Sequence, residues 1–231
     1  APIILKYYIA KQTSRMSHPS TTIRPFADAK PLSIRIWHWA TALFFSVSII
    51  TVSINEFILD GRTQIQAVNN AAQEKGVTLD RDQTRAIVRT FREPIWELHK
   101  YAGFGISILL LWRMFIEFRS VKNNRLAFKL KAAFNRKQKV EGTALEQNHF
   151  SMVQAGYLIF YVLIVLMACT GLILAFEEVP FFKSIHDPAK ETHELLQWAF
   201  YTYAVIHIGG VVWSDSKLYN GLVSKMIHGK Q

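Results

Sequence analysis

The sequence predicts an all-α integral membrane protein, a four-helix bundle with a helical loop on the extracytoplasmic side. Three observations support this fold class. Half of the 231 residues are apolar although the net charge is +10. The apolar residues are concentrated in four long runs, and the charged residues gather between these runs. A soluble domain rarely concentrates its apolar residues in this way.

Each of the four runs is long enough to cross a bilayer, since a span needs roughly 20 apolar residues. The runs cover about residues 36–54, 96–118, 152–176 and 193–213. We expect each run to form one membrane helix. Only the second run contains an arginine deep within it, Arg113.

The charges of the connecting segments predict the orientation in the membrane. Residues 119–150 hold eight Lys or Arg and two Glu, whereas residues 55–94 hold six of each sign. Residues 177–192 hold two Lys and four acidic residues. Because Lys and Arg are enriched in cytoplasmic loops, the 119–150 connection and both termini are expected in the cytoplasm.

These assignments divide the chain into a bundle with additions. The expected parts are a cytoplasmic N-terminal extension at 1–30, the bundle at 31–216 with an extracytoplasmic insertion at 55–94, and a cytoplasmic tail at 217–231. The first residues, from Ala1, show no charged and apolar leader with a cleavage site, so no secretory signal peptide is expected.

The extracytoplasmic insertion is long for a connection between two membrane helices. Gly76 divides it into two stretches of helical character, residues 63–75 and 80–92, and Asp80 is the expected N-cap of the second. Two interpretations of the insertion remain open: a solvated cap over the bundle, or a docking surface for an external partner.

Four of the eight histidines lie near the ends of the apolar runs: His38, His99, His193 and His207. A polar side chain at this depth is costly unless it has a partner. His193 and His207 are separated by 14 residues, which is about 21 Å along one helix and within about 40° on the same face. One imidazole is therefore expected near each membrane face.

The other two histidines supply a partner at each depth. His99 and His193 each follow a proline, Pro94 or Pro188, by five positions, and both prolines suit the first position of a helix. These two histidines are therefore expected at equal depth on the outside. The remaining two match in depth on the cytoplasmic side.

Two histidine pairs at opposite faces suit two six-coordinate haem irons, each held by imidazoles from facing helices. A zinc site would need a third or fourth ligand. The single cysteine, Cys169, excludes covalent haem attachment through a Cys-x-x-Cys-His motif. The alternative is a haem-free anchor or transporter in which the histidines pack or relay protons, although broken membrane helices typical of transporters are not predicted.

Three further residues are candidates for cofactor contacts. Gly103 lies one turn from His99 and would let a porphyrin approach the backbone, although small residues also help membrane helices to pack. Arg113 repeats the 14-residue offset from His99, so we expect a haem propionate or a quinone oxygen as its partner, with a local pair to Glu117 as the alternative. Arg35 is a similar candidate, for which snorkelling to the interface is the favoured interpretation.

Together these residues resemble the bacterial di-haem cytochrome b family, which contains the b-type subunits of membrane-bound nickel-iron hydrogenases and formate dehydrogenases as well as stand-alone cytochrome b561. The resemblance covers about residues 31–216. The motifs that carry it are Arg35-Ile36-Trp37-His38-Trp39, the segment from Trp96 to Gly103, Leu111-Trp112-Arg113, and the segment from His193 to His207.

The resemblance implies two haem b groups with paired histidine ligands, a quinone pocket and a place in the bacterial inner membrane. Gln154-Ala155-Gly156-Tyr157, followed by Thr170-Gly171, is similar to the third helix of the family. By that analogy Gln154, Gly156 and His207 would face the quinone.

The function implied is that of an electron-transfer subunit between an extracytoplasmic redox subunit and the membrane quinone. That subunit would be an iron-sulfur, hydrogenase-like or cytochrome protein; lipid is an expected partner and nucleic acid is not. The long insertion and the N-terminal extension favour a subunit of a larger assembly. The alternative is a stand-alone quinone-linked oxidoreductase such as a superoxide oxidase.

Overall fold

The computed structural model describes residues 30–120, 125–134, 142–219 and 221–229, so the predicted N-terminal extension lies almost wholly outside it. The described residues form helices and no strand, which confirms the all-α class. Contacts divide the chain into two units. One holds residues 121–156 with the N-terminal residues, and the other holds residues 28–120 and 157–231.

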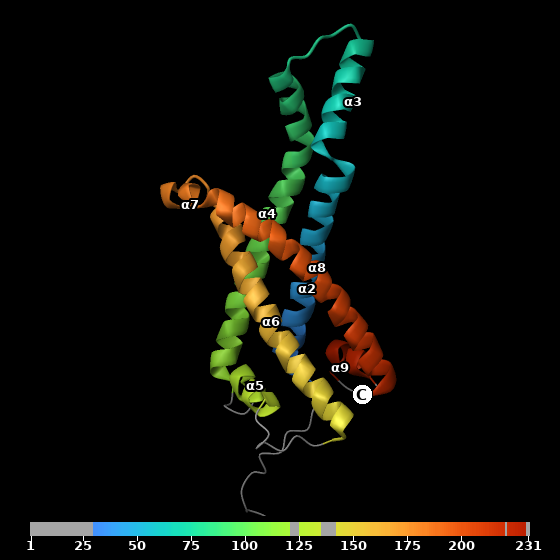
Figure 1. The fold of residues 1–231 in the computed structure, drawn as a ribbon, viewed down its shortest axis with the longest axis vertical. Coiled ribbons are helices and arrows are strands. Elements are labelled where there is room, and N and C mark those ends of the chain that lie inside the picture. Colours follow the sequence, from blue (N-terminus) through green and yellow to red (C-terminus); the bar gives the residue numbers. More distant parts are fainter. Residues whose placement is uncertain (1–29, 121–124, 135–141, 220, 230–231) are drawn as a thin grey trace, which may run out of the picture. The chain divides into compact units, whose positions relative to one another are not determined.

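Among the described residues, four helices are long and apolar enough to cross a membrane, which confirms the predicted spans. They are α2 (Leu32–Ser53), α4 (Arg81–Arg119), α6 (Ala144–Ala175) and α8 (His186–Lys217) (Figure 1). The chain is therefore a multi-pass membrane protein.

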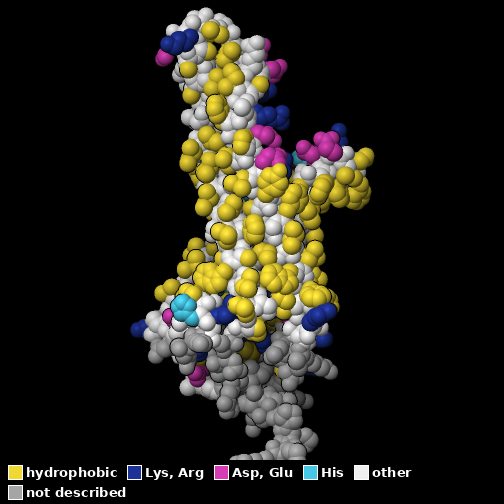
Figure 2. Space-filling view, turned by 180° about the vertical axis from the view of Figure 1, so that it is seen from behind, with side chains coloured by type: hydrophobic (Ala, Val, Ile, Leu, Met, Phe, Trp, Pro, Cys, Tyr) yellow, Lys and Arg dark blue, Asp and Glu magenta, His cyan; other side chains and the backbone are white. Residues whose placement is uncertain are grey.

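The outward surfaces of these helices are apolar. Leu43, Ile108 and Val205 are 64%, 66% and 73% exposed, which suits side chains that face lipid and not a protein core. Figure 2 shows hydrophobic side chains over the surface of these helices, with Asp and Glu side chains gathered beyond them on the arm and beside α7 (Pro180–Ser184).

A helical arm occupies the predicted insertion. It consists of α3 (Gly61–Glu74) and the first part of α4, which run side by side in Figure 1. Asp80 caps α4 as predicted: its carboxylate accepts from the amides of Asp82 and Gln83, and the Gln83 side chain accepts from the Asp80 amide. Gly76 has a φ of 71°, the left-handed conformation that glycine adopts at low cost after a helix.

The prediction that Pro94 begins a new helix is wrong. α4 runs without interruption from Arg81 to Arg119, with Pro94 inside it. A helix of 39 residues is about 58 Å long, roughly twice the thickness of a bilayer core, so α4 both crosses the membrane and carries one side of the arm. Proline costs an interior helix one hydrogen bond, and the packing of α4 against α3 offsets that loss.

Three short helices fall outside the predicted elements. They are α5 (Leu126–Phe134), α7, and α9 (Leu222–Ile227). In the first unit, Ser151 of α6 donates to the Ala133 carbonyl of α5 at 3.2 Å.

The described part of the C-terminal tail folds back onto the start of α2. Arg35 Nη1 donates to the Ile227 carbonyl of α9 at 3.2 Å, and Trp39 Nε1 donates to the Met226 carbonyl at 3.1 Å. Arg35 thus reaches the last turn of α9, where the carbonyls lack helical partners.

The hydrophobic core of the second unit lies between the depths of the histidine pairs. Its buried members are Ile106, Leu110, Ile164 and Phe200. Phe200 is seven residues from His193 and seven from His207 on α8. The ring of Phe200 lies 4.8 Å from that of Phe45, and both belong to an aromatic cluster that fills this level. An apolar layer therefore separates the two levels at which the histidines lie.

Candidate functional site

The structure brings the four predicted histidines together as two pairs. His38 of α2 faces His207 of α8 with ring centroids 6.2 Å apart. His99 of α4 faces His193 of α8 with ring centroids 6.3 Å apart. No third His, Cys, Asp or Glu joins either pair among the described residues, so neither pair is a zinc site of ordinary composition.

Both separations fit a pair of axial ligands on one metal ion. A ligating imidazole nitrogen lies about 2 Å from its metal and about 1 Å from its own ring centre, so two rings on opposite sides of one ion have centroids about 6 Å apart. Two imidazoles hold an iron stably when a porphyrin supplies its other four ligands. The donor set and its spacing therefore fit haem.

Hydroxyl groups on α2 orient His99. Its Nδ1 lies 3.2 Å from Ser48 Oγ and 3.3 Å from Thr51 Oγ1. The Thr51 hydroxyl donates its hydrogen to the Ser48 carbonyl at 2.8 Å, so its oxygen is left to accept from the histidine. His99 then carries its proton on Nδ1, and Nε2 keeps the lone pair that a metal needs.

His193 is oriented in the same manner by α6. Its Nδ1 lies 2.9 Å from Thr170 Oγ1. The Thr170 hydroxyl also lies 2.9 Å from the Leu166 carbonyl, to which it can donate, so its oxygen accepts from His193. A Cβ at Gly171 would lie 3.2 Å from the imidazole Cε1 of His193, so glycine lets the ring lie against the α6 backbone.

The pair of His38 and His207 is held by aromatic contacts. Tyr203 stacks on His207 with an interplanar angle of 7°, and the Trp39 ring meets the His38 ring edge to face at 5.2 Å. The Nδ1 atom of His38 is buried and has no hydrogen-bond partner in the protein. A buried polar atom without a partner is costly, which suits a site that a bound group completes.

Arg113 forms the local ion pair with Glu117, which was the alternative prediction from the sequence. Its Nη1 lies 3.0 Å from Glu117 Oε2, and both side chains are largely buried. The guanidinium carbon lies 5.7 Å from the ring centroids of both Trp37 and Tyr161, within the range of cation–π attraction. Arg113 is thus already partnered, and its contact with a propionate or a quinone remains a prediction.

The three other predicted contacts have different surroundings. A Cβ at Gly103 would meet nothing within 4 Å, so space is open beside the backbone one turn from His99. Gln154 is 3% exposed and its Oε1 has no partner, while a Cβ at Gly156 would meet open space. Both belong to the first unit, and their approach to a quinone beside His207 remains a prediction.

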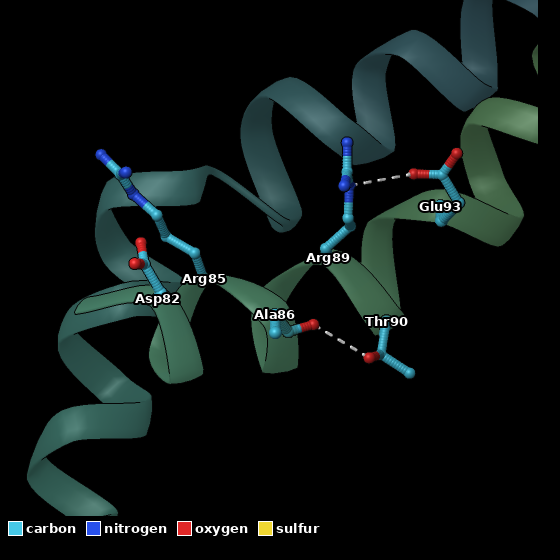
Figure 3. Close-up of a pocket in the computed structure, with 6 residues that line it drawn as sticks. All are labelled: Asp82, Arg85, Ala86, Arg89, Thr90 and Glu93. Atoms are coloured by element: carbon cyan, nitrogen blue, oxygen red, sulfur yellow. Dashed lines mark hydrogen bonds and ion pairs between the residues drawn. The ribbon is translucent and has the colours of Figure 1, made fainter. Parts of the chain in front are cut away.

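A recess on the arm has a different character (Figure 3). Asp82, Arg85, Ala86, Arg89, Thr90 and Glu93 line it. Arg89 and Glu93 form an ion pair at 3.7 Å with side chains 81% and 50% exposed. These are solvated charges of both signs on one helix face, which resemble a partner-facing surface more than a catalytic centre.

Sequence reasoning did not identify the hydroxyl groups that orient the ligands. Ser48, Thr51 and Thr170 lie in apolar runs, where Ser and Thr commonly bond their own helix backbone. In the sequence Thr170 stands out only as part of the Thr170-Gly171 motif. Its contact with His193 on a neighbouring helix is visible only once the helices are packed.

The comparison with protein families agrees with this geometry. The profile of the prokaryotic cytochrome b561 family matches residues 30–229. That range contains all four paired histidines and all four membrane helices. No curated protein and no solved structure matches the chain. The chain belongs to the prokaryotic cytochrome b561 family, and it is a membrane electron-transfer protein of the haem b type.

Proposed function

We propose that the chain holds two haem b groups, one between His38 and His207 and one between His99 and His193, and conducts electrons through them across the membrane. The observation that carries this proposal is the pair of ring separations, 6.2 and 6.3 Å, at two levels of one bundle. The haems supply reversible one-electron chemistry when bound.

The residues of this chain fix the ligands and exclude water. Ser48, Thr51 and Thr170 hold the imidazoles of one pair in the tautomer that leaves Nε2 free. The aromatic layer around Phe45 and Phe200 fills the space between the two histidine pairs and excludes water from it. Both sites lie in a low-dielectric bundle, in which hydrogen bonds and burial tune redox potentials.

We further propose the order of the path. Electrons would pass between an extracytoplasmic redox subunit at the arm and the membrane quinone through the site of His99 and His193 and the site of His38 and His207, in the direction that the partner sets. The positive charge of the 119–150 connection supports placing the latter pair near the cytoplasm of a bacterial inner membrane. The projecting arm, with its exposed charges, supports a partner outside.

Rapid mixing with quinone tests this path. Purified protein is reduced with dithionite and mixed with an excess of a soluble ubiquinone or menaquinone analogue, and haem absorbance is followed. We expect oxidation of both haems in the unaltered protein. In His207→Ala the remaining haem should be oxidised at least about tenfold more slowly, because this variant has lost the haem that exchanges electrons with quinone.

His186→Ala is the matched control, since His186 lies at the start of α8 and pairs with Glu177 and Asp187. It should oxidise like the unaltered protein. A His207→Ala protein that retains one haem and is still oxidised by quinone at the full rate would contradict the proposed path.

A further inference from the structure

A buried amide lies on the arm side of the His99 and His193 pair. Asn55 is 0% exposed, and neither its Nδ2 nor its Oδ1 has a hydrogen-bond partner in the protein. It belongs to the π-helix η1 (Ile54–Ile58) that continues α2. A buried amide with no partner at either end is rare and costly, and π-helical turns occur frequently at functional sites.

Arg92 lies beside this amide. Its Nη2 is 3.5 Å from the Asn55 backbone carbonyl, and its Nε is buried without a partner. A Cβ at Gly61 would lie 3.0 Å from Arg92 Nη1, so the absence of a side chain at that position makes room for the guanidinium. No carboxylate of the described residues forms an ion pair with Arg92, since the adjacent Glu93 pairs with Arg89.

Both residues lie close to the histidine pair along their helices. Asn55 follows Thr51 by four residues, and Thr51 contacts His99. Arg92 precedes His99 by seven residues, which puts the two on the same face about 10 Å apart along α4. Trp96 connects them: it lines a cavity of about 300 Å³ with Arg92, and its ring lies 5.7 Å from that of His99.

The chemistry of this group suits a carboxylate. A guanidinium and an amide NH₂ are donors that bind carboxylate oxygens in charge-assisted hydrogen bonds. Arg92 is half-buried, and a low-dielectric setting favours the pairing of such a cation with an anion. Asn55 lies one turn beyond Thr51 and Arg92 about two turns beyond His99, so both donors lie on the arm side of this histidine pair.

We propose that Asn55 and Arg92 bind the propionate carboxylates of the haem held by His99 and His193. This assignment rests on the proposed function. It also predicts an effect of Arg92 on the midpoint potential of that haem. A positive charge near the iron favours the reduced form and so raises the potential. The same donors could take a dissolved carboxylate, and the experiment separates the two sources.

The test uses three variants of the full-length, haem-loaded protein. Arg92→Gln and Asn55→Leu should each lower the midpoint potential of one haem in a redox titration, or speed its transfer to apomyoglobin about tenfold, while the other haem is unchanged. Arg92→Lys keeps the charge and should keep most of the potential. The unchanged second haem reports that the bundle is folded.

Arg81→Gln is the matched control. It removes the same charge from the same helix, 11 residues further from His99, at a helix N-terminus where a cation is unfavourable. It should leave both potentials unchanged. If Arg92→Gln behaves like Arg81→Gln in protein with two haems, the assignment is wrong and the proposed function stands. If the unaltered protein holds no haem at this level, the proposed function itself fails.

Haem dimethyl ester distinguishes the source of the carboxylate. Protein produced without haem is loaded with the ester, in which both propionates are uncharged. Transfer of the ester to apomyoglobin should then be equally fast from the unaltered protein and from Arg92→Gln, because the contact that differs between them is missing. A difference that persists with the ester would assign Arg92 and Asn55 to a dissolved anion and overturn the propionate assignment.

Discussion

At the scale of single residues, hydrogen bonds from neighbouring helices decide which nitrogen of His99 and of His193 is available. The hydroxyls of Thr51 and Thr170 donate to carbonyls of their own helices, so their oxygens accept from His99 and His193. In the proposed haem site these hydroxyls would hold the orientation of each imidazole and strengthen its donation to iron. They place Thr170 among the positioning residues of this site.

Thr170→Val tests that role. The variant removes the acceptor for His193 Nδ1, so the ligand donates more weakly and the oxidised iron is less stabilised. We expect a higher midpoint potential for one haem and about tenfold weaker retention of it, with the other haem unchanged. Thr170→Ser should restore both.

Thr202→Val is the control for that variant, because Thr202 of α8 is exposed and bonds the Trp198 carbonyl of its own helix. It should leave both potentials in place. Equal potentials in Thr170→Val and the unaltered protein would show that Thr170 only packs.

The four histidines could be predicted from the sequence because their spacing maps directly onto depth along helices. The partners of Arg113 could not be chosen in advance. On one helix, Arg113 lies one turn from Glu117 and four turns from His99. The sequence therefore allows both the local ion pair and a contact with a cofactor. Only packing shows that the guanidinium lies near the rings of both Trp37 and Tyr161.

At the scale of helices, close packing of α2 against α4 depends on a small residue. A Cβ at Gly105 would lie 2.7 Å from the Phe44 ring. Trp37 Nε1 also donates to the Leu109 carbonyl of α4 at 2.9 Å, so the two helices approach closely along this stretch. Each carries a histidine of one pair, His38 on α2 and His99 on α4, so the spacing of the two helices affects the geometry of both pairs.

Gly105→Ala should lower the thermal unfolding temperature of the purified protein, since overpacking typically costs about 1–3 kcal/mol. The double variant Gly105→Ala with Phe44→Leu should recover most of the loss, because the smaller side chain leaves room for the methyl group. Thermal melts followed by the haem absorbance would measure both. A loss that the second substitution does not relieve would show that Phe44 is not the obstacle.

The start of α3 should respond to pH. The amide and hydroxyl of Thr63 donate to the Asp60 carboxylate at 3.0 Å each, and these bonds hold the pKa of Asp60 below its ordinary value. Because the folded-state pKa is lowered, the cap contributes fully above the carboxyl's unfolded pKa and is lost as the pH falls through the lowered value.

Hydrogen exchange of the first-turn amides of α3 should therefore accelerate in acid. Asp60→Asn caps the helix without titrating and should show little pH response, while Asp60→Ala should exchange rapidly at all pH values. An acid response of the same size in the Asn variant would assign it to another group.

The sequence predicted the four spans and both arm helices, because apolar length and capping signals are local. The predicted helix start at Pro94 is wrong, because the helix capped by Asp80 continues through that residue. Tertiary contacts between α3 and α4 extend the helix across a residue that usually ends one. The short helices α7 and α9 carry too few residues to produce a periodic signal.

At the scale of the whole molecule, charge asymmetry predicts which ends of the helices face the cytoplasm. A variant without the native cysteine, Cys169→Ala, allows single cysteines to report the side. Val77→Cys in the turn of the arm should react with an impermeant maleimide in intact cells, because the charge asymmetry predicts that the arm is extracytoplasmic. Val223→Cys in α9 should react only after permeabilisation. The reverse pattern would contradict the orientation.

The haem content of paired variants tests the central claim most directly. The unaltered protein should carry two haems per chain by pyridine haemochrome. His38→Ala, His207→Ala and their double variant should each carry one, and His99→Ala, His193→Ala and their double variant should each carry the other. A colourless unaltered protein would contradict the account, and so would a double variant within one pair that loses both haems while its single variants keep one.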